Sequence, residues 1–497
     1  MARRISGGGR LPLPKLDKQI IALWRKKQVI SMTYDLVVIG SGPGGYEGAI
    51  RASQNGLKVA IVERELLGGI CLNWGCIPTK ALLKSAEVFD KINHLGDYGL
   101  TGEKPGFDFE KVVKRSRDVA KQLNGGVGYL MKKNKIDVIE GFATLSPGKD
   151  APKVTVKLNK GGEQVVEAKN VMLAVGARAR EIPAIGAVSD GDRIWTYRNA
   201  LSPNRMPKSL VVIGSGAIGI EFASFYRSLG ADVTVVEALD RILPVEDKEV
   251  SAEAQKAFEK RGFKFRIGAK VTKVEKSASG VKVSVEVGGK AEVLEAEGCI
   301  VAVGIVANTE NLGLEALGVE MDRGHIKNDS HGKTNVKGLY AIGDCAGPPW
   351  LAHKASHEAV HAADYMAGKK LSNLNPPIPG CTYAPPEVAS VGITEQGAKE
   401  KGLDVKIGRF PFKANGKAIA AGEPGGFVKV IFDKKTGALL GAHLIGANVT
   451  EMVQGFCLAI TMEATEEDLQ GTVFPHPTMS EAILEASLDA DGRMINL

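Results

Sequence analysis

The sequence contains the same heptapeptide twice. Leu-Val-Val-Ile-Gly-Ser-Gly runs from Leu36 to Gly42 and recurs from Leu210 to Gly216, at an offset of 174 residues. The repeat extends beyond the heptapeptide, because three further residues recur at the same offset: Gly45 with Gly219, Glu47 with Glu221, and Glu63 with Glu237. This register predicts that one folding unit, carrying one kind of site, occurs twice in the chain.

Each copy reads as a buried strand, a Gly-x-Gly-x-x-Gly turn, a helix and a second strand (58–63 or 233–237) that ends in glutamate. In such a unit the glycines allow a tight turn, the close approach of a pyrophosphate and the packing of the helix on the strand. The glutamate accepts hydrogen bonds from the ribose hydroxyls. A lone glycine turn often has only a structural role. Here the strand, the helix and the acidic residue stand at the positions that the motif requires in both copies, which predicts two Rossmann-like dinucleotide sites. Their candidate residues are Gly40, Gly42, Gly45 and Glu63, and Gly214, Gly216, Gly219 and Glu237.

The second site is expected to bind NAD. Glu237 disfavours the additional phosphate of NADP, which usually requires a nearby arginine. Arg241 lies four residues further on and argues the other way, although Asp240 beside it can neutralise its charge.

Composition favours a large α/β enzyme. The chain has 497 residues, 44% of them hydrophobic, and 60 glycines. No uncharged stretch reaches the roughly 18 residues of a spanning helix, so no membrane association is expected. Six cysteines in so long a chain do not indicate a secreted disulfide framework and favour a reducing compartment, in which any disulfide is catalytic.

The positive net charge of +7 lies entirely at the N-terminus. Residues 1–32 contain eight Lys or Arg and one acidic residue, which leaves 56 basic and 56 acidic residues elsewhere. A nucleic-acid partner is therefore not expected. The segment reads as a basic extension, and an organelle presequence, a tag and translation from upstream of Met32 are all compatible with it.

The chain is expected to divide into several parts. The first nucleotide unit is followed by helical patterns from Pro78 to about Ile92 and from Phe109 to Asn134. A proline-rich linker at 376–380 precedes alternating strands and then helices, which predicts a separate C-terminal α+β domain. The expected ranges are a basic extension (1–32), an FAD-type domain (33–184), an NAD-type domain (185–304), a central return to the first domain (305–375) and an interface domain (376–497).

Two cysteines lie five positions apart in the segment 68–80, Gly-Gly-Ile-Cys-Leu-Asn-Trp-Gly-Cys-Ile-Pro-Thr-Lys. They are Cys71 and Cys76, placed at the start of one expected helix. Two structural cysteines and a redox pair are both compatible with this spacing, while zinc lacks further ligands at suitable positions. A helix N-terminus would stabilise a thiolate at Cys76.

This segment resembles the redox-active disulfide of the pyridine nucleotide-disulfide oxidoreductase family, and most closely that of its lipoamide-linked members. The similarity extends from Thr33 to the C-terminus. It implies an α/β fold with FAD-binding and NAD-binding Rossmann-like domains and a C-terminal α+β dimerisation domain. It assigns the first glycine motif to FAD and 334–344 to a second flavin motif, in which Asp344 faces the ribityl chain rather than capping a helix.

The resemblance also implies roles for individual residues. Cys71 becomes the thiol that exchanges with substrate, and Cys76 the charge-transfer thiol beside the flavin. Lys80 and Glu221 match an ion pair near the flavin ring. Gly304 ends the strand of the second unit and is placed in the cofactor site.

The segment 474–481, Phe-Pro-His-Pro-Thr-Met-Ser-Glu, resembles the acid-base motif of the family. His476 would accept a proton from the dithiol, and Glu481 would hold its imidazole in the useful tautomer. By itself the spacing of Thr478 and Glu481 also fits a capping box.

The implied reaction is the oxidation of dihydrolipoamide by NAD through FAD and a Cys71–Cys76 disulfide, in a cytoplasmic homodimer, or a mitochondrial one if residues 1–31 are a presequence. The implied partner is a lipoyl-bearing acyltransferase or the lipoyl carrier of glycine cleavage. The alternatives are a related reductase for glutathione, trypanothione or mercuric ion, and a flavin-binding redox sensor without turnover. Glu237 disfavours the NADP-linked reductases, and the intact cysteine pair with His476 disfavours the sensor.

Overall fold

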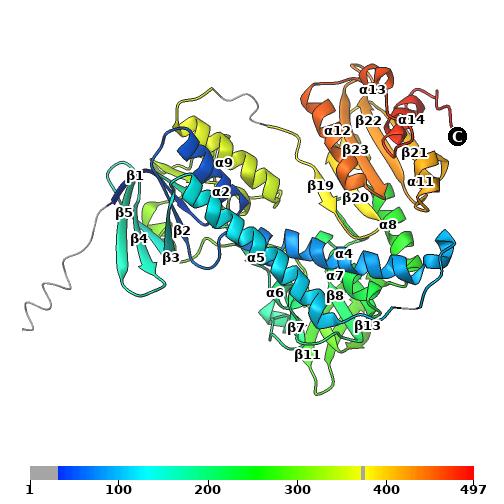
Figure 1. The fold of residues 1–497 in the computed structure, drawn as a ribbon, viewed down its shortest axis with the longest axis horizontal. Coiled ribbons are helices and arrows are strands. Elements are labelled where there is room, and N and C mark those ends of the chain that lie inside the picture. Colours follow the sequence, from blue (N-terminus) through cyan, green and yellow to red (C-terminus); the bar gives the residue numbers. More distant parts are fainter. Residues whose placement is uncertain (1–31, 104, 371–374) are drawn as a thin grey trace, which may run out of the picture.

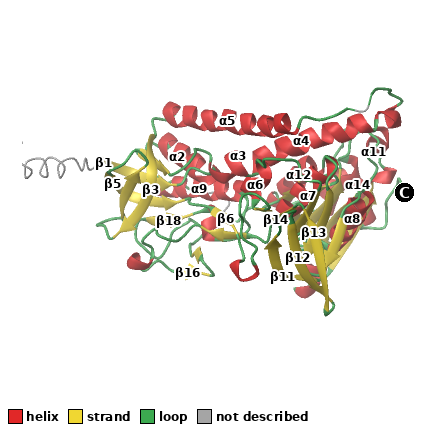
Figure 2. Ribbon diagram, turned by 90° about the horizontal axis from the view of Figure 1, so that it is seen from below, coloured by secondary structure: helices red, strands yellow, loops and turns green. Residues whose placement is uncertain are grey.

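The computed structural model describes residues 32–103, 105–370 and 375–497. The basic extension expected for 1–32 therefore lies, apart from Met32, outside the described residues. In Figure 1 the first part of the chain lies at the left, the second part lies below, and the C-terminal part lies at the upper right. The long helices α4 (Cys76–Asn93) and α5 (Phe109–Lys133) run along one side of the molecule (Figure 2). No helix within the described ranges is both long and apolar enough to cross a membrane.

The first part is built on a mixed sheet. Strands β3, β2, β1, β5 and β18 lie side by side in parallel, and β4 joins β3 to β5 as an antiparallel meander. Strand β18 comes from 166 residues later in the chain than β5, so the chain leaves this part and returns to it. The elements are β1 (Met32–Ile39), α2 (Pro43–Gln54), β2 (Val59–Glu63), α3 (Gly69–Trp74), α4 (Cys76–Asn93), α5 (Phe109–Lys133), β3 (Asp137–Ser146), β4 (Lys153–Leu158), β5 (Glu163–Leu173), β18 (Leu339–Ala341) and α9 (Ala352–Met366).

The second part repeats the strand-helix-strand unit. Its five strands are parallel in the order β10-β9-β8-β14-β7, and a three-stranded antiparallel sheet, β11-β12-β13, accompanies them. The elements are β7 (Ile194–Trp195), α6 (Tyr197–Leu201), β8 (Ser209–Ile213), α7 (Ala217–Ser228), β9 (Asp232–Glu237), α8 (Lys248–Lys260), β10 (Lys264–Ile267), β11 (Ala269–Lys276), β12 (Val281–Val287), β13 (Lys290–Ala296) and β14 (Gly298–Val301). A short antiparallel pair, β6 (Ala177–Ala179) and β15 (Ile305–Ala307), links the segments that enter and leave this part.

The C-terminal part is an antiparallel sheet in the order β19-β20-β23-β22-β21 with helices on it. The turn at 434–438 joins β22 to β23. The elements are β19 (Gly380–Thr382), β20 (Glu387–Gly392), α10 (Glu395–Glu400), β21 (Val405–Pro411), α11 (Gly416–Ala420), β22 (Phe427–Asp433), β23 (Leu439–Gly446), α12 (Val449–Thr461), α13 (Glu466–Gly471) and α14 (Glu481–Asp489). The predicted fold class, two Rossmann-like parts followed by an α+β part, is confirmed.

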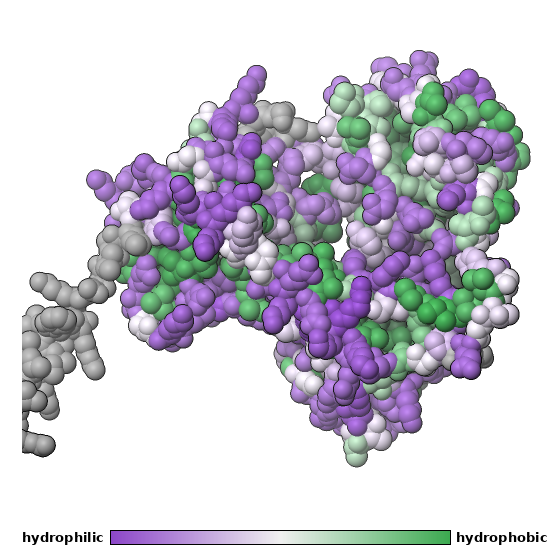
Figure 3. Space-filling view, in the orientation of Figure 1, coloured by the Kyte–Doolittle hydropathy of each residue, from purple (hydrophilic) through white to green (hydrophobic). Residues whose placement is uncertain are grey.

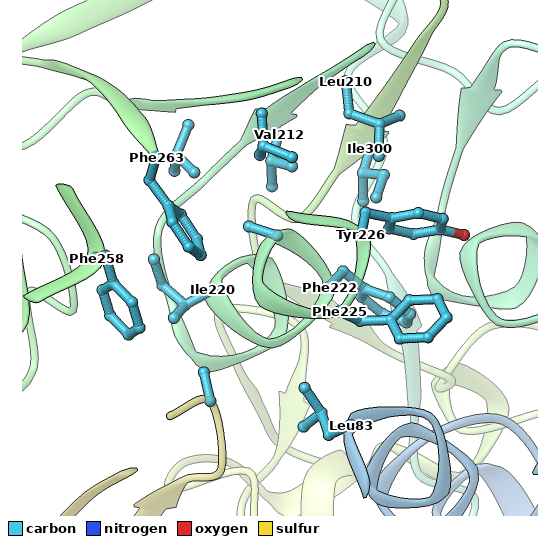
Figure 4. Close-up of a cluster of buried hydrophobic side chains, with 14 of the residues drawn as sticks. Leu83, Leu210, Val212, Ile220, Phe222, Phe225, Tyr226, Phe258, Phe263 and Ile300 are labelled. Atoms are coloured by element: carbon cyan, nitrogen blue, oxygen red, sulfur yellow. The ribbon is translucent and has the colours of Figure 1, made fainter. Parts of the chain in front are cut away.

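One buried cluster joins the first part to the second. Leu83 of α4 packs with Phe222 and Phe225 of α7 in the cluster shown in Figure 4. Because side chains three or four residues apart share a helix face, this packing also turns Lys80 of α4 and Glu221 of α7 toward each other. A Phe→Ala change in such a core typically costs about 3–5 kcal/mol, so the apolar contact holds the two helices in register.

The sequence prediction was wrong at one point near the redox motif. Cys71 and Cys76 do not lie at the start of a single helix, because α3 ends at Trp74 and α4 begins at Cys76. Gly75 separates the two helices with φ −143° and ψ −113°. A backbone at these angles cannot continue a helix, so each cysteine has its own helix.

Candidate functional site

A cleft of about 1350 Å³ lies where the three parts of the chain meet. The space-filling view shows the molecule hollowed between the part that carries α2 and α9 and the C-terminal part (Figure 3). Both cysteines of the motif and nine of the twelve predicted cofactor residues line the cleft. These residues are Cys71, Cys76, Gly40, Gly42, Gly45, Glu63, Lys80, Gly216, Glu221, Gly304 and Asp344. Gly214, Gly219 and Glu237 do not line it, and Glu237 is buried behind its loop.

The first glycine loop has the form that a pyrophosphate requires. Gly40 has φ +96°, and a Cβ there would come within 2.3 Å of the Ala174 carbonyl oxygen. A Cβ on Gly45 would come within 2.0 Å of the Gly40 carbonyl oxygen, so helix α2 packs directly on β1. A Cβ on Gly42 would meet no atom within 4 Å, so that a side chain would only fill the space in front of the α2 N-terminus. The residues present therefore fit a dinucleotide phosphate at this helix end.

The second loop reproduces this geometry. Gly214 has φ +100° and its Cβ would lie 2.3 Å from the Ala302 carbonyl oxygen, while a Cβ on Gly219 would lie 2.0 Å from that of Gly214. A Cβ on Gly216 would again meet no atom within 4 Å. The repeat in the sequence thus corresponds to two loops of the same shape.

A serine within each repeated heptapeptide holds the glutamate that ends the next strand. Glu63 Oε2 accepts hydrogen bonds from Ser41 N (3.0 Å) and Ser41 Oγ (2.6 Å), and Glu237 Oε2 accepts the same pair from Ser215 at 2.9 and 2.6 Å. Sequence reasoning missed these serines, although their place between two paired glycines was the available signal. Each carboxylate is fixed before any ribose arrives, which reduces the ordering cost of binding.

The guanidinium of Arg241 is bound by neighbouring groups of the protein and is not free to bind a phosphate. Its guanidinium makes an ion pair with Asp240 (2.9 Å) and donates to the Pro244 carbonyl oxygen (2.8 Å). This arrangement agrees with the expected preference of the second site for NAD.

The two cysteines of the motif lie beside each other as free thiols. Their hydrogen bond, together with burial, raises the pKa of Cys71. The same hydrogen bond is the main reason why the pKa of Cys76 is lowered, against the effect of burial, and the Lys80 ammonium group lowers it further. Cys76 is also the first residue of α4, where the helix dipole favours a thiolate. The electrostatics therefore make Cys76 the more readily ionised thiol.

Lys80 and Glu221 form an ion pair between α4 and α7. Lys80 Nζ lies 3.0 and 2.9 Å from the two carboxylate oxygens of Glu221. The side chain of Glu221 is 6% exposed, so its charge depends on this partner.

Asp344 follows β18 and lies in the short 3₁₀ turn Gly343–Ala346. The N-cap of that turn is Ile342, so the alternative interpretation of Asp344 as a helix cap is wrong. Burial raises the pKa of the Asp344 carboxyl, and its residue lines the cleft. A half-buried carboxyl that lines the cleft suits a hydrogen bond to a ligand hydroxyl.

His476 and Glu481 are brought together but lie away from this cleft. His476 Nδ1 is 2.8 Å from Glu481 Oε1, and the other carboxylate oxygen of Glu481 accepts from Thr478 N at 2.8 Å. Partial burial alone would raise the pKa of Glu481, but these two hydrogen bonds hold it below its ordinary value. The alternative interpretation of Thr478 as a helix cap does not hold, since the N-cap of α14 is Ser480. The His476 side chain is 78% exposed, so within one chain its imidazole faces solvent.

Comparison with known proteins agrees with this geometry. Residues 34–359 match the family model for the pyridine nucleotide-disulphide oxidoreductases, and residues 378–487 match the dimerisation domain of the same family. A dihydrolipoyl dehydrogenase of Rhizobium etli is 58% identical over 93% of this chain and 99% of its own length, and one of Bacillus subtilis is 43% identical over 93% and 99%. The crystal structure of LpdA from Mycobacterium tuberculosis superposes with a TM-score of 0.85 at 26% identity, covering 91% of this chain and 98% of LpdA. The chain belongs to the pyridine nucleotide-disulphide oxidoreductase family.

Proposed function

We propose that this protein oxidises dihydrolipoamide to lipoamide with NAD as the electron acceptor. The observation that carries the proposal is the Cys71 and Cys76 pair lining one cleft with two dinucleotide loops. The curated relatives described above, named dihydrolipoyl dehydrogenases, support the choice of substrate.

FAD and NAD are the cofactors. The loop of Gly40, Gly42 and Gly45 with Glu63 would hold FAD, and Asp344 would bind its ribityl hydroxyls. The second loop with Glu237 would hold NAD. When bound, FAD carries two electrons from the cysteine pair to NAD.

The cysteines carry out the exchange with substrate. In the oxidised protein they form a disulfide, and one substrate thiolate attacks Cys71 Sγ, so that a mixed disulfide forms and Cys76 leaves as a thiolate. The second substrate thiolate then attacks the substrate sulfur of the mixed disulfide. Lipoamide departs, and the leaving Cys71 thiolate takes up one of the two substrate protons while the other is released, so the pair now holds the two electrons that the substrate lost. Lys80 stabilises the Cys76 thiolate throughout.

The imidazole of His476 is proposed to accept the substrate proton and later return it to Cys71. Its Nδ1 faces Glu481, which leaves Nε2 free to act as the base. Since His476 is exposed in one chain, the dimerisation domain supports delivery of this residue to the cleft of a partner chain. Large exposed apolar side chains in this part are suited to such an interface, and they include Leu458, Met462, Val473, Ile495 and Leu497.

The homodimer is proposed to serve a 2-oxoacid dehydrogenase or glycine cleavage complex, with a lipoyl-bearing acyltransferase or lipoyl carrier protein as its partner. Bacterial relatives support a cytoplasmic location, with the mitochondrial matrix as the alternative if residues 1–31 are a presequence.

A substrate comparison tests the proposed function. Purified FAD-loaded protein is assayed for NADH oxidation with lipoamide and, in parallel, for NADPH oxidation with glutathione disulfide. Turnover is expected only in the first assay. Faster reduction of glutathione disulfide would assign the protein to the rival group of reductases.

Exchanging either strand-ending glutamate for alanine tests the assignment of the two nucleotide sites. Glu237→Ala is expected to raise the KM for NAD about 10- to 100-fold, because a charged acceptor of ribose hydroxyls contributes about 1.5–3 kcal/mol. Its flavin content is expected to stay near that of the unaltered protein. Glu63→Ala is expected to lose FAD during gel filtration, measured by flavin absorbance. If the two phenotypes are exchanged, the sites have been assigned the wrong way round.

A further inference from the structure

Within the part of the chain that the structure describes, Tyr383 contacts both members of the Lys80–Glu221 ion pair. Its backbone N–H donates to Glu221 Oε1 at 2.9 Å. The Lys80 Nζ lies over the Tyr383 ring, 4.3 Å from the centroid. Tyr383 directly follows β19, so the three groups come from the first, second and C-terminal parts of the chain.

The orientation of the Tyr383 ring is set by a third contact. Its hydroxyl hydrogen-bonds the thiol of Cys381, two residues earlier, and burial together with this contact raises the pKa of Tyr383. The half-buried Tyr383 thus contacts Cys381 through its hydroxyl, Lys80 through its ring face and Glu221 through its backbone N–H. Tyr383 is absent from the lining of the cleft, although Cys381 and Thr382 line it. It therefore acts on the site through Lys80 and Glu221.

The position of the Lys80 ammonium group matters because two opposite charges act on Cys76. Lys80 lies one helical turn after Cys76 and favours its thiolate, whereas Glu221 disfavours it. The net electrostatic potential at the Cys76 sulfur is the difference between the contributions of the Lys80 and Glu221 charges. Such a difference changes appreciably when one charge moves by a fraction of an ångström, particularly where burial weakens solvent screening.

The contacts of Tyr383 limit that movement. A cation over an aromatic face gains about 0.5–2 kcal/mol, with the larger values at desolvated sites. The side chain of Lys80 is 31% exposed, and the ring covers part of its ammonium group in place of water. The N–H of Tyr383 meanwhile satisfies a lone pair of the buried Glu221 carboxylate, which would otherwise carry a desolvation cost.

We propose that Tyr383 is a positioning residue of the redox centre, whose ring and backbone hold Lys80 and Glu221 in the arrangement that stabilises the Cys76 thiolate. This inference rests on the proposed role of Cys76 as the thiol beside the flavin. The C-terminal part of a chain thus contributes to the redox centre of that same chain.

A test can read the Cys76 thiolate without substrate turnover. In a Cys71→Ser background, Cys76 is the only thiol of the pair, and its thiolate gives a long-wavelength charge-transfer absorbance with oxidised flavin. The pH at which this absorbance appears measures the ionisation of Cys76. The titratable or charged groups facing Cys76 in this background are Lys80 of α4 and Glu221 of α7. Those facing Tyr383 are Lys80, Cys381, Glu221 and Glu387.

The ring face is varied without changing its shape. Tyr383→Phe keeps the ring and the N–H, and phenylalanines with one, two and three ring fluorines placed at position 383 weaken its attraction for a cation stepwise. The midpoint of the charge-transfer titration is expected to rise with each fluorine and to be highest in Tyr383→Leu. In proteins with Cys71 intact, the rate of flavin reduction by dihydrolipoamide is expected to fall about five- to tenfold from Tyr383→Phe to Tyr383→Leu, as the cation-π energy requires.

The fluorinated series keeps the proposal open to refutation even if Tyr383→Leu does not fold. If Tyr383 only fills space, all the fluorinated rings will titrate alike, and that result would overturn the proposal. Tyr365→Leu is the matched control, because Tyr365 also lies under a lysine, Lys333, at 5.6 Å but outside the cleft. It is expected to leave the titration unchanged. Lipoamide turnover does not enter the titration, so failure of the proposed substrate assignment would be seen separately.

Discussion

Cys71→Ser is expected to reduce lipoamide turnover by at least about 10³-fold, the scale seen when a nucleophile is removed from an active site. A serine hydroxyl cannot form the mixed disulfide with substrate, and Cys76 alone cannot replace it. FAD content is expected to remain near one per chain, because no glycine of the loops and neither strand-ending glutamate is altered. Electron transfer from NADH to an artificial dye should also persist, since it needs the flavin and the NAD site alone.

The measurement compares lipoamide and dye activities in the same preparation. Cys299→Ala serves as the control, because Cys299 is a buried thiol on β14 outside the cleft lining, and it should retain both activities. Lipoamide turnover that survives in Cys71→Ser would show that Cys71 is not the exchanging thiol. Loss of the dye activity as well would mean that the substitution had damaged the flavin site.

Mixing two inactive variants is expected to restore activity. In a shared site, His476 of one chain serves the cysteine pair of the other. A hybrid of Cys76→Ser and His476→Gln chains then has one site with both lesions and one site with none. Random pairing of equal amounts makes half of the dimers hybrids, so roughly a quarter of the unaltered activity should return.

A reciprocal mixture provides the control. A chain carrying both substitutions is paired with the unaltered chain, and in the shared-site arrangement each site of that hybrid carries one lesion and is inactive. If each site lay within a single chain, this second hybrid would be half active and the first would be dead. Differently tagged chains allow the hybrids to be isolated, so that their formation is established before activity is measured.

The features predicted from the sequence are those that depend on neighbours along the chain. The repeated glycines specify their loops locally, since a positive φ at Gly40 and the tight contact at Gly45 admit no other residue. The strands beside them are continuous apolar runs, as parallel strands buried on both faces require. The pair of His476 and Glu481 is likewise local, because the two residues are five positions apart.

The break at Gly75 shows the limit of local reasoning. The segment around the cysteines has the composition of one helix start, and only the packing of α3 and α4 against α5 in the folded chain divides it in two. The side-chain periodicity of the segment 68–80 does not predict the break between α3 and α4. The break occurs at Gly75, and a glycine can adopt many backbone conformations.

The sequence by itself determined the two nucleotide folds, the cysteine pair and the pairing of His476 with Glu481, because each is encoded within one short segment by backbone sterics and side-chain spacing. Only the tertiary structure decided how these segments meet. Lys80 and Glu221 are 141 residues apart, and Tyr383 lies a further 162 residues along. Their contact depends on apolar packing between α4 and α7 and on the return of the chain through β19. Such packing sums many weak, non-directional contacts, and no single residue in the sequence signals its result.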